Sequence, residues 1–207
     1  MKLRSWSFAT TLLLSVGVAG YAVWAYSNGT QRVPVHPDMV AAFDRHRALI
    51  TTHAVASALA LLLGPLQFLD SLRAARPRLH RALGYAYLVP GVGVGGISGL
   101  LLAHHSYGGL VSHYGFGLLA VLWIFTGVMA VVAAKARRFV AHRTWMVRNF
   151  ALTFAAVTLR LYLLLGFLSG LRFEDFYPAI AWLCWVPNLL FVEWVTLRPT
   201  APLNPTP

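Results

Sequence analysis

Histidine is the residue type in this chain best suited to chemistry, and all eight copies lie at or near the ends of long apolar segments. His53 and His113 stand at matched depth in two segments that run in the same direction, and His80 and His142 do so at the opposite end of two others. Facing helices that each supply one imidazole hold haem iron through its two axial positions. The spacing therefore predicts an outer and an inner site for haem b. The alternative is that boundary histidines are solvated amphipathic groups.

Arginines near these histidines are the candidate partners of an anionic cofactor. Arg81, Arg143 and Arg148 lie beside the inner pair, where charge-assisted hydrogen bonds to two propionates are favourable. Arg160 lies inside an apolar segment, where an arginine costs roughly 2.5–3.5 kcal/mol on insertion scales and is a functional candidate by default. We expect Arg160 to face the bundle interior and to neutralise a haem propionate, a quinone oxygen or an acidic substrate. The alternative is that Arg160 extends to the outer interface.

A polar stripe accompanies Arg160. His142, Asn149, Thr153 and Arg160 follow one another at separations of 7, 4 and 7 residues. Eighteen residues at about 100° each make five whole turns, so the stripe is predicted to occupy one helix face. Glu193 lies near the inner end of the last segment, and we expect it to form a structural ion pair with an arginine at the same depth. The candidates are Arg81, Arg143 and Arg148.

Glycines recur at four-residue spacing between the two histidine levels, at Gly91, Gly95 and Gly99. Small residues at this period let a neighbouring helix backbone approach closely. The same row also makes room for a flat macrocycle. The sequence leaves both interpretations open, with helix packing the simpler of the two.

The elements that position these residues are long apolar segments. Six of them approach the 20 or so residues that a membrane span requires. They are residues 6–26, 49–69, 80–103, 113–134, 145–168 and 179–197. Backbone groups in lipid must be satisfied within their own helix, so we predict an all-α integral membrane protein, a six-helix transmembrane bundle with a four-helix core of helices 2–5. Residues 1–198 form a single transmembrane domain, and residues 199–207, rich in proline, form a disordered tail.

The amino-acid composition also indicates an integral membrane protein. Apolar residues make up 58% of the chain and charged residues 11%, against about 45–50% and 25% in soluble domains. One cysteine, Cys184, excludes a disulfide scaffold. The net charge of +11 does not indicate nucleic acid, because Lys and Arg gather in short loops between apolar segments. The sequence contains no Walker-type glycine loop and no HExxH zinc motif.

The distribution of Lys and Arg predicts the orientation. Twelve of them (positions 2, 4, 73, 76, 78, 81, 135, 137, 138, 143, 148 and 198) fall on one side, and four (32, 45, 47 and 172) fall on the other. The positive-inside rule therefore places both termini in the cytoplasm. An uncleaved anchor is the favoured interpretation of the first segment, and a cleaved signal peptide is the alternative.

The predicted outer face holds further histidines: His36, His46, His104 and His105. Residues 37–50 are predicted to form a helix that begins at Pro37 and continues into span two. His46 and His53 then share one face, about 10 Å apart along the axis. Imidazoles suit zinc, copper, nickel or iron, so a metal-capture site on this face is a second interpretation.

Five strings stand out: GPLQF (Gly64–Phe68), RPRLHRALGYAY (Arg76–Tyr87), GFGLLAVLW (Gly115–Trp123), AHRTWMVRNFALTFAAVTLR (Ala141–Arg160) and AWLCWVPNLLFVE (Ala181–Glu193). With these strings the chain resembles an uncharacterised DUF-type family (domain of unknown function) of bacterial multi-pass membrane proteins, over roughly residues 36–193. That resemblance implies an integral membrane protein with no assigned reaction. The histidine layout is similar to that of transmembrane ascorbate-reducible b-type cytochromes, which implies haem ligation by His53, His80, His113 and His142.

Three functions remain open at this stage, and the residues do not decide whether the protein is an enzyme. The first is a haem-b electron carrier or quinone-linked oxidoreductase subunit, which works in the lipid bilayer with quinone or a redox partner protein. The second is a transporter or metal-handling permease that uses Arg160 and the outer histidines. The third is a membrane subunit with no chemistry of its own.

Overall fold

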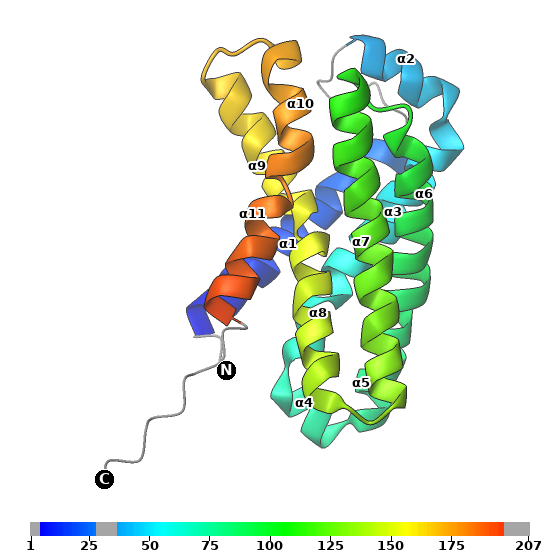
Figure 1. Ribbon diagram of the computed structural model, residues 1–207, viewed down its shortest axis with the longest axis vertical. Coiled ribbons are helices and arrows are strands. Elements are labelled where there is room, and N and C mark those ends of the chain that lie inside the picture. Colours follow the sequence, from blue (N-terminus) through cyan, green and yellow to red (C-terminus); the bar gives the residue numbers. More distant parts are fainter. Residues whose placement is uncertain (1–4, 28–36, 197–207) are drawn as a thin grey trace.

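The protein is an all-helical bundle, as predicted (Figure 1). The computed structural model describes residues 5–27 and 37–196, and these contain helices and no strand. Within those ranges, six helical stretches are long and apolar enough to cross a membrane, which confirms the predicted number. They are Phe8–Tyr26, Arg47–Phe68, Pro77–Ala103, Gly109–Lys135, Phe139–Leu168 and Phe173–Trp194. His36 and the predicted tail, 199–207, lie outside the described residues.

Most spans consist of more than one helical element. The elements are α1 (Ser5–Ser27), α2 (Pro37–Arg45), α3 (Arg47–Leu63), η2 (Pro65–Phe68), α4 (Asp70–Ala75), α5 (Pro77–Ala86), η3 (Tyr87–Gly93), α6 (Val94–Ala103), α7 (Gly109–Lys135), α8 (Phe139–Thr153), α9 (Ala155–Leu168), α10 (Phe173–Leu183), α11 (Val186–Phe191) and η4 (Val192–Thr196). Proline marks several of the changes: Pro65 begins η2, Pro77 begins α5, and Pro90 lies within the wide π-helical turns of η3. Proline removes one backbone donor and crowds the preceding turn, so regular α-helix stops or widens there.

Helices from spans two to five form the core, which confirms the predicted four-helix arrangement. α3 packs on α6, α6 on α7, and α7 on α8. Glycines on the third span permit this approach: a Cβ at Gly91 would lie 3.0 Å from Ala60 Cβ, and one at Gly95 would lie 3.0 Å from the Trp123 ring. The glycine row is thus filled by neighbouring side chains along this stretch, as the packing interpretation requires.

The fifth span is broken at Phe154, between α8 and α9. Thr153 Oγ1 donates to Asn149 O at 3.0 Å, and Thr158 Oγ1 donates to Phe154 O at 3.3 Å. Hydroxyls that bond back to helix carbonyls compete with the backbone ladder and bend the helix. In Figure 1, α9 leans away from α7 and pairs with α10, while α1 crosses behind. The break therefore opens the bundle in the half that contains α9 and α10.

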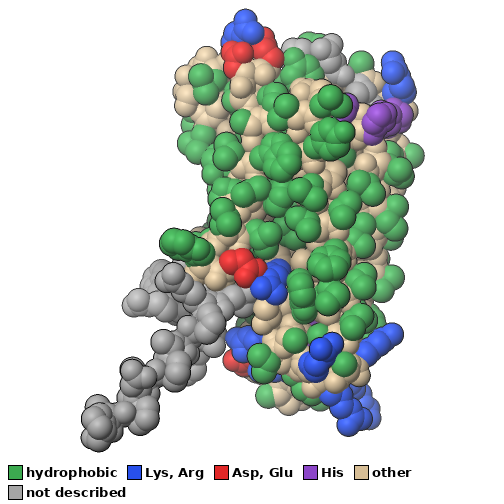
Figure 2. Space-filling view, in the orientation of Figure 1, with side chains coloured by type: hydrophobic (Ala, Val, Ile, Leu, Met, Phe, Trp, Pro, Cys, Tyr) green, Lys and Arg blue, Asp and Glu red, His purple; other side chains and the backbone are tan. Residues whose placement is uncertain are grey.

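The helix predicted over residues 37–50 is interrupted. α2 ends at Arg45, and α3 begins at Arg47 after His46, which has φ −114° and ψ 32°. His46 and His53 therefore do not share one continuous helix face, because the chain turns between them. Figure 2 shows most of the basic side chains at one end of the molecule and the histidines of this view at the other.

Candidate functional site

A cavity of about 630 Å³ lies in the half of the bundle opened by the break at Phe154. Helices α1, α3, α6, α7, α9 and α10 all contribute to its wall, which is mainly apolar. The polar side chains that line it are Tyr21, Tyr26, His53, Ser57, His105, Ser106, Tyr107, Thr153, Arg160 and Tyr177. A concave, largely apolar space with a few polar groups is the usual form of a small-molecule site.

His53 is held rigidly in this wall. Its Nδ1 lies 2.9 Å from Gly95 O, and a carbonyl oxygen can only accept, so Nδ1 carries the proton. A Cβ at Gly99 would lie 2.8 Å from His53 Cε1, so only glycine leaves room for the ring. In the neutral ring Nε2 then bears the lone pair, and its nearest polar neighbour is Ser57 Oγ at 3.5 Å. His53 thus offers the cavity a fixed proton acceptor.

Arg160 brings a positive charge into the same wall. Its Nη1 donates to Ala156 O at 2.8 Å, one turn nearer the middle of the span, so the side chain does not extend toward the outer interface. The guanidinium lies 5.9 Å from the Tyr21 ring centroid, and its Nε is buried with no hydrogen-bond partner. No carboxylate among the described side chains pairs with Arg160. Arg160 and His53 also lie close enough to interact electrostatically.

The predicted outer histidine pair divides between two environments. His53 lines the cavity, whereas the described part of the cavity wall does not include His113. His113 Nε2 instead donates to Ser106 O at 3.0 Å, and its ring lies 5.6 Å from that of His104. Joint ligation of one iron by these two histidines stays a prediction.

The remaining outer histidines form a cluster of ring contacts. His46 stacks on His105 at 3.9 Å, and His104 lies 5.3 Å from His105. Desolvation, and then the neighbouring histidines and Arg45, lowers the pKa of His105, which favours the neutral form of that ring. Within residues 5–27 and 37–196, no three His, Cys, Asp or Glu side chains are arranged to hold a metal ion.

The inner histidines lie near one another at the opposite end of the core. His142 Nδ1 donates to Ala130 O on α7 at 2.9 Å, which leaves the lone pair on Nε2. His80 Nδ1 is buried and has no hydrogen-bond partner. His142 and Arg81 both lie within electrostatic range of His80. Joint ligation of one iron by His80 and His142 stays a prediction, as for the outer pair.

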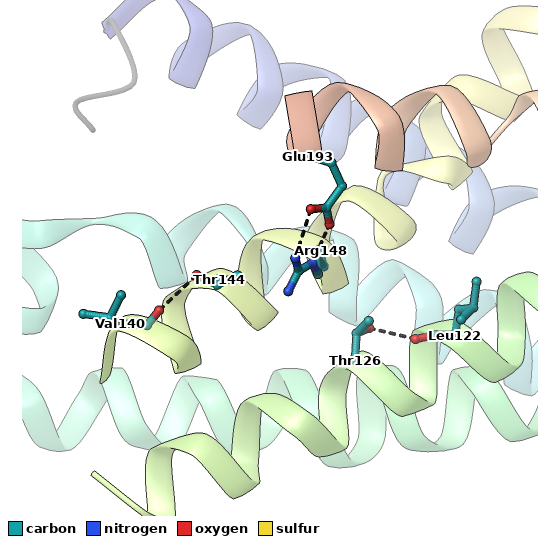
Figure 3. Close-up of polar contacts among 6 residues, drawn as sticks. All are labelled: Leu122, Thr126, Val140, Thr144, Arg148 and Glu193. Carbon is teal, nitrogen blue, oxygen red and sulfur yellow. Dashed lines mark hydrogen bonds and ion pairs between the residues drawn. The ribbon is translucent and has the colours of Figure 1, made fainter. Parts of the chain in front are cut away.

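Arg148 is already paired. Both oxygens of Glu193 accept from its guanidinium, Oε1 from Nε and Oε2 from Nη2 at 2.9 Å, and Figure 3 shows this two-pronged contact between α8 and η4. The guanidinium also lies 4.7 Å from the Trp145 ring centroid. The predicted structural ion pair of Glu193 is confirmed, with Arg148 as its partner. A propionate at the inner site would have to compete with Glu193 for Arg148.

A buried hydrogen-bond network fills the middle of the core. The Tyr87 hydroxyl donates to Asn149 Oδ1 at 2.6 Å and lies 2.8 Å from Thr153 Oγ1. Asn149 Nδ2 donates to Trp123 O and Thr126 Oγ1, and Trp123 Nε1 donates to Thr153 Oγ1. The network joins the third, fourth and fifth spans. The roles of Tyr87 and Trp123 in this network could not be predicted from the sequence, since an aromatic residue in an apolar segment gives no distinct signal.

The predicted polar stripe is shared among three environments. His142 bonds to α7, Asn149 and Thr153 belong to the core network, and Arg160 lines the cavity. Thr153 also lines the cavity, so Thr153 and Arg160 still face the same space across the change of helix at Phe154. The functional residues of this stripe therefore serve different purposes.

Comparison with known proteins gives one match. A family model described as "Predicted membrane protein (DUF2306)" matches residues 50–196, which include nearly all of spans two to six. No curated protein and no solved structure matches the chain.

Proposed function

The chain belongs to this family of predicted membrane proteins, and from the cavity beside Arg160 we propose that it is a quinone-linked oxidoreductase subunit that binds a quinone there. The observation that carries the proposal is the unpartnered Nε of Arg160 in a cavity that also presents Nε2 of His53. A charge left uncompensated in an apolar wall is costly, and its usual partner is a functional ligand.

The chemistry of a quinone suits this wall. Its carbonyl oxygens accept hydrogen bonds, and Arg160 supplies donors in a fixed planar fork. The hydroxyls of the reduced quinol donate, and His53 Nε2 is an acceptor held in one orientation by Gly95 O. The isoprenoid tail would lie along the apolar parts of α1 and α9. The charge distribution supports a bacterial inner membrane location with cytoplasmic termini. In that orientation the cavity would lie in the outer half of the bilayer.

Binding of decylubiquinone to the detergent-purified protein tests the proposal, with equilibrium dialysis as the measurement. We expect His53→Leu to weaken binding of the reduced form about tenfold, which corresponds to about 1.4 kcal/mol. His113→Leu is the matched control, because it removes a histidine of similar predicted depth that does not line the cavity. Equal losses in both variants would instead favour the bis-histidine outer haem site. Binding of laurate without binding of decylubiquinone would favour an acidic-substrate transporter.

The inner histidines support a second candidate function, electron transfer through haem b. The residues fit this group in part: His80 Nδ1 is buried without a partner, and His142 keeps Nε2 free by donating from Nδ1. His80 and His142 would hold the iron, Arg81 would pair with a propionate, and the group would supply one-electron transfer. Metal-ligating histidines characteristically donate their other ring nitrogen to a carbonyl, as His142 does.

An absorbance spectrum tests the second candidate. Protein produced with an ample haem supply should show a low-spin b-type Soret band, and His80→Ala and His142→Ala should each abolish it. His46→Ala should retain the band, because His46 lies in the outer histidine cluster. A wild-type protein without Soret absorption would exclude haem b at the inner pair.

A further inference from the structure

The turn between α7 and α8 is built on an arginine where glycine is usual. Arg137 N–H donates to Ala134 O and Arg138 N–H donates to Ala133 O, both at 2.9 Å, which is the Schellman pattern that closes a helix. The residue at the centre of this pattern adopts the left-handed conformation, and Arg137 does so with φ 58°. Side chains other than glycine are strained there. Position 137 therefore holds an arginine although its left-handed backbone conformation favours glycine.

The same turn borders an open groove. Its lining joins the two turn arginines to the first turns of α8, with Phe139, Val140, Thr144 and Trp145. Phe139 and Val140 are 66% and 85% exposed, although both begin a membrane span. Figure 3 shows Val140 and Thr144 on α8, about two turns and one turn before Arg148, respectively. The groove thus combines cationic groups with apolar side chains at the expected depth of the membrane interface, where tryptophan is also favoured.

The charges of Arg137 and Arg138 are uncompensated, whereas Arg148, which also lines the groove, is paired with Glu193. The structure records no ion pair between Arg137 or Arg138 and any described carboxylate. Glu193, the acidic side chain that reaches this part of α8, is already bound by Arg148. Lys135 ends α7 on the same turn and adds a further positive charge.

We propose that this groove binds an anionic phospholipid, with the phosphate at Arg137 and Arg138 and an acyl chain along Phe139 and Val140. The group that the two arginines would bind is a phosphate ester. The exposed apolar side chains of Phe139 and Val140 indicate that this ester belongs to a lipid. Basic pockets at the cytoplasmic ends of transmembrane helices hold anionic headgroups in this way. The proposal depends on neither the quinone cavity nor the inner histidines, because the groove uses other residues.

The substitution Arg137→Gly tests the site, since glycine keeps the turn while removing the guanidinium. We expect native mass spectrometry in neutral detergent to show one retained phosphatidylglycerol on the wild-type protein, with at least tenfold preference over phosphatidylcholine. Arg137→Gly should reduce that preference at least fivefold and raise the thermal midpoint in the same detergent. The higher midpoint would show that the loss of lipid does not come from misfolding.

Arg78→Gln is the matched control, because Arg78 lies on α5 at the same end of the molecule and does not line the groove. Equal loss in this variant would overturn the proposal in favour of diffuse surface charge. Retention of phosphatidylglycerol by Arg137→Gly would overturn it directly. Displacement of the lipid by millimolar inorganic phosphate would show a phosphate site that has no specificity for lipid, which also contradicts the proposal.

Discussion

Arg160→Leu is expected to make the protein more stable while abolishing quinone binding. An arginine at the centre of a membrane helix costs roughly 2.5–3.5 kcal/mol on insertion scales, whereas leucine is slightly favourable there. The contacts of the guanidinium in this protein are one carbonyl and one distant ring, and Nε has no partner. We therefore expect a gain of about 2 kcal/mol in unfolding free energy, measured by thermal unfolding, together with a loss of decylubiquinone binding of at least a hundredfold.

Arg160→Lys is the control for this prediction. Lysine keeps the charge and lacks the planar fork, so the unfolding free energy should change little while quinone binding still weakens. Lower stability in Arg160→Leu would mean that the carbonyl and ring contacts outweigh the cost of the buried charge. Unchanged quinone binding in both variants would remove Arg160 from the site.

Asn149→Ala is expected to cause the largest loss of stability. Asn149 is fully buried and connects Tyr87, Trp123 and Thr126 from neighbouring spans. A hydrogen bond between membrane helices contributes about 0.6 kcal/mol on average and up to about 1.7 kcal/mol. A buried group left without a partner adds about 1–3 kcal/mol. We expect a combined loss of about 3 kcal/mol, measured by denaturant titration in mixed micelles.

Asn188→Ala is the comparison, because Asn188 Nδ2 lies within hydrogen-bond distance of acceptors on Ala151, Thr158 and Cys184 but the side chain is only partly buried. The unfolding free energy of Asn188→Ala should fall by about 1 kcal/mol, near the average for hydrogen bonds between membrane helices. Tyr87→Phe removes the bond to Asn149 and the contact with Thr153, and should have a similar effect alone. In combination with Asn149→Ala, it should add less than it costs alone, because the bond that the two residues share is already lost. Full additivity would show that the network is not a coupled unit.

The spans could be predicted from sequence because apolar length is a local property. An ion pair of Glu193 with one of three arginines could be predicted because depth in the membrane follows from position along each span, and the structure selects Arg148. The stripe could be recognised from its spacing, but the division of its side chains among the α7 contact, the core network and the cavity depends on partners from other helices. Tyr87 and Trp123 were missed for a related reason: their importance comes from partners on other helices. The cavity likewise arises from the tilt of α9, which no local pattern encodes.

The rim of the cavity has a consequence for how its ligand is supplied. Tyr21, Leu164 and Phe167 line the cavity and are also 38%, 54% and 46% exposed, on helices that face the bilayer. A ligand entering past these side chains comes from the lipid phase, and its effective concentration is set by its partition coefficient. Occupancy should then follow the mole fraction of ligand in the membrane. Diluting the same total ligand with additional lipid should therefore lower the occupancy of the site, even though the total amount of ligand in the sample is unchanged.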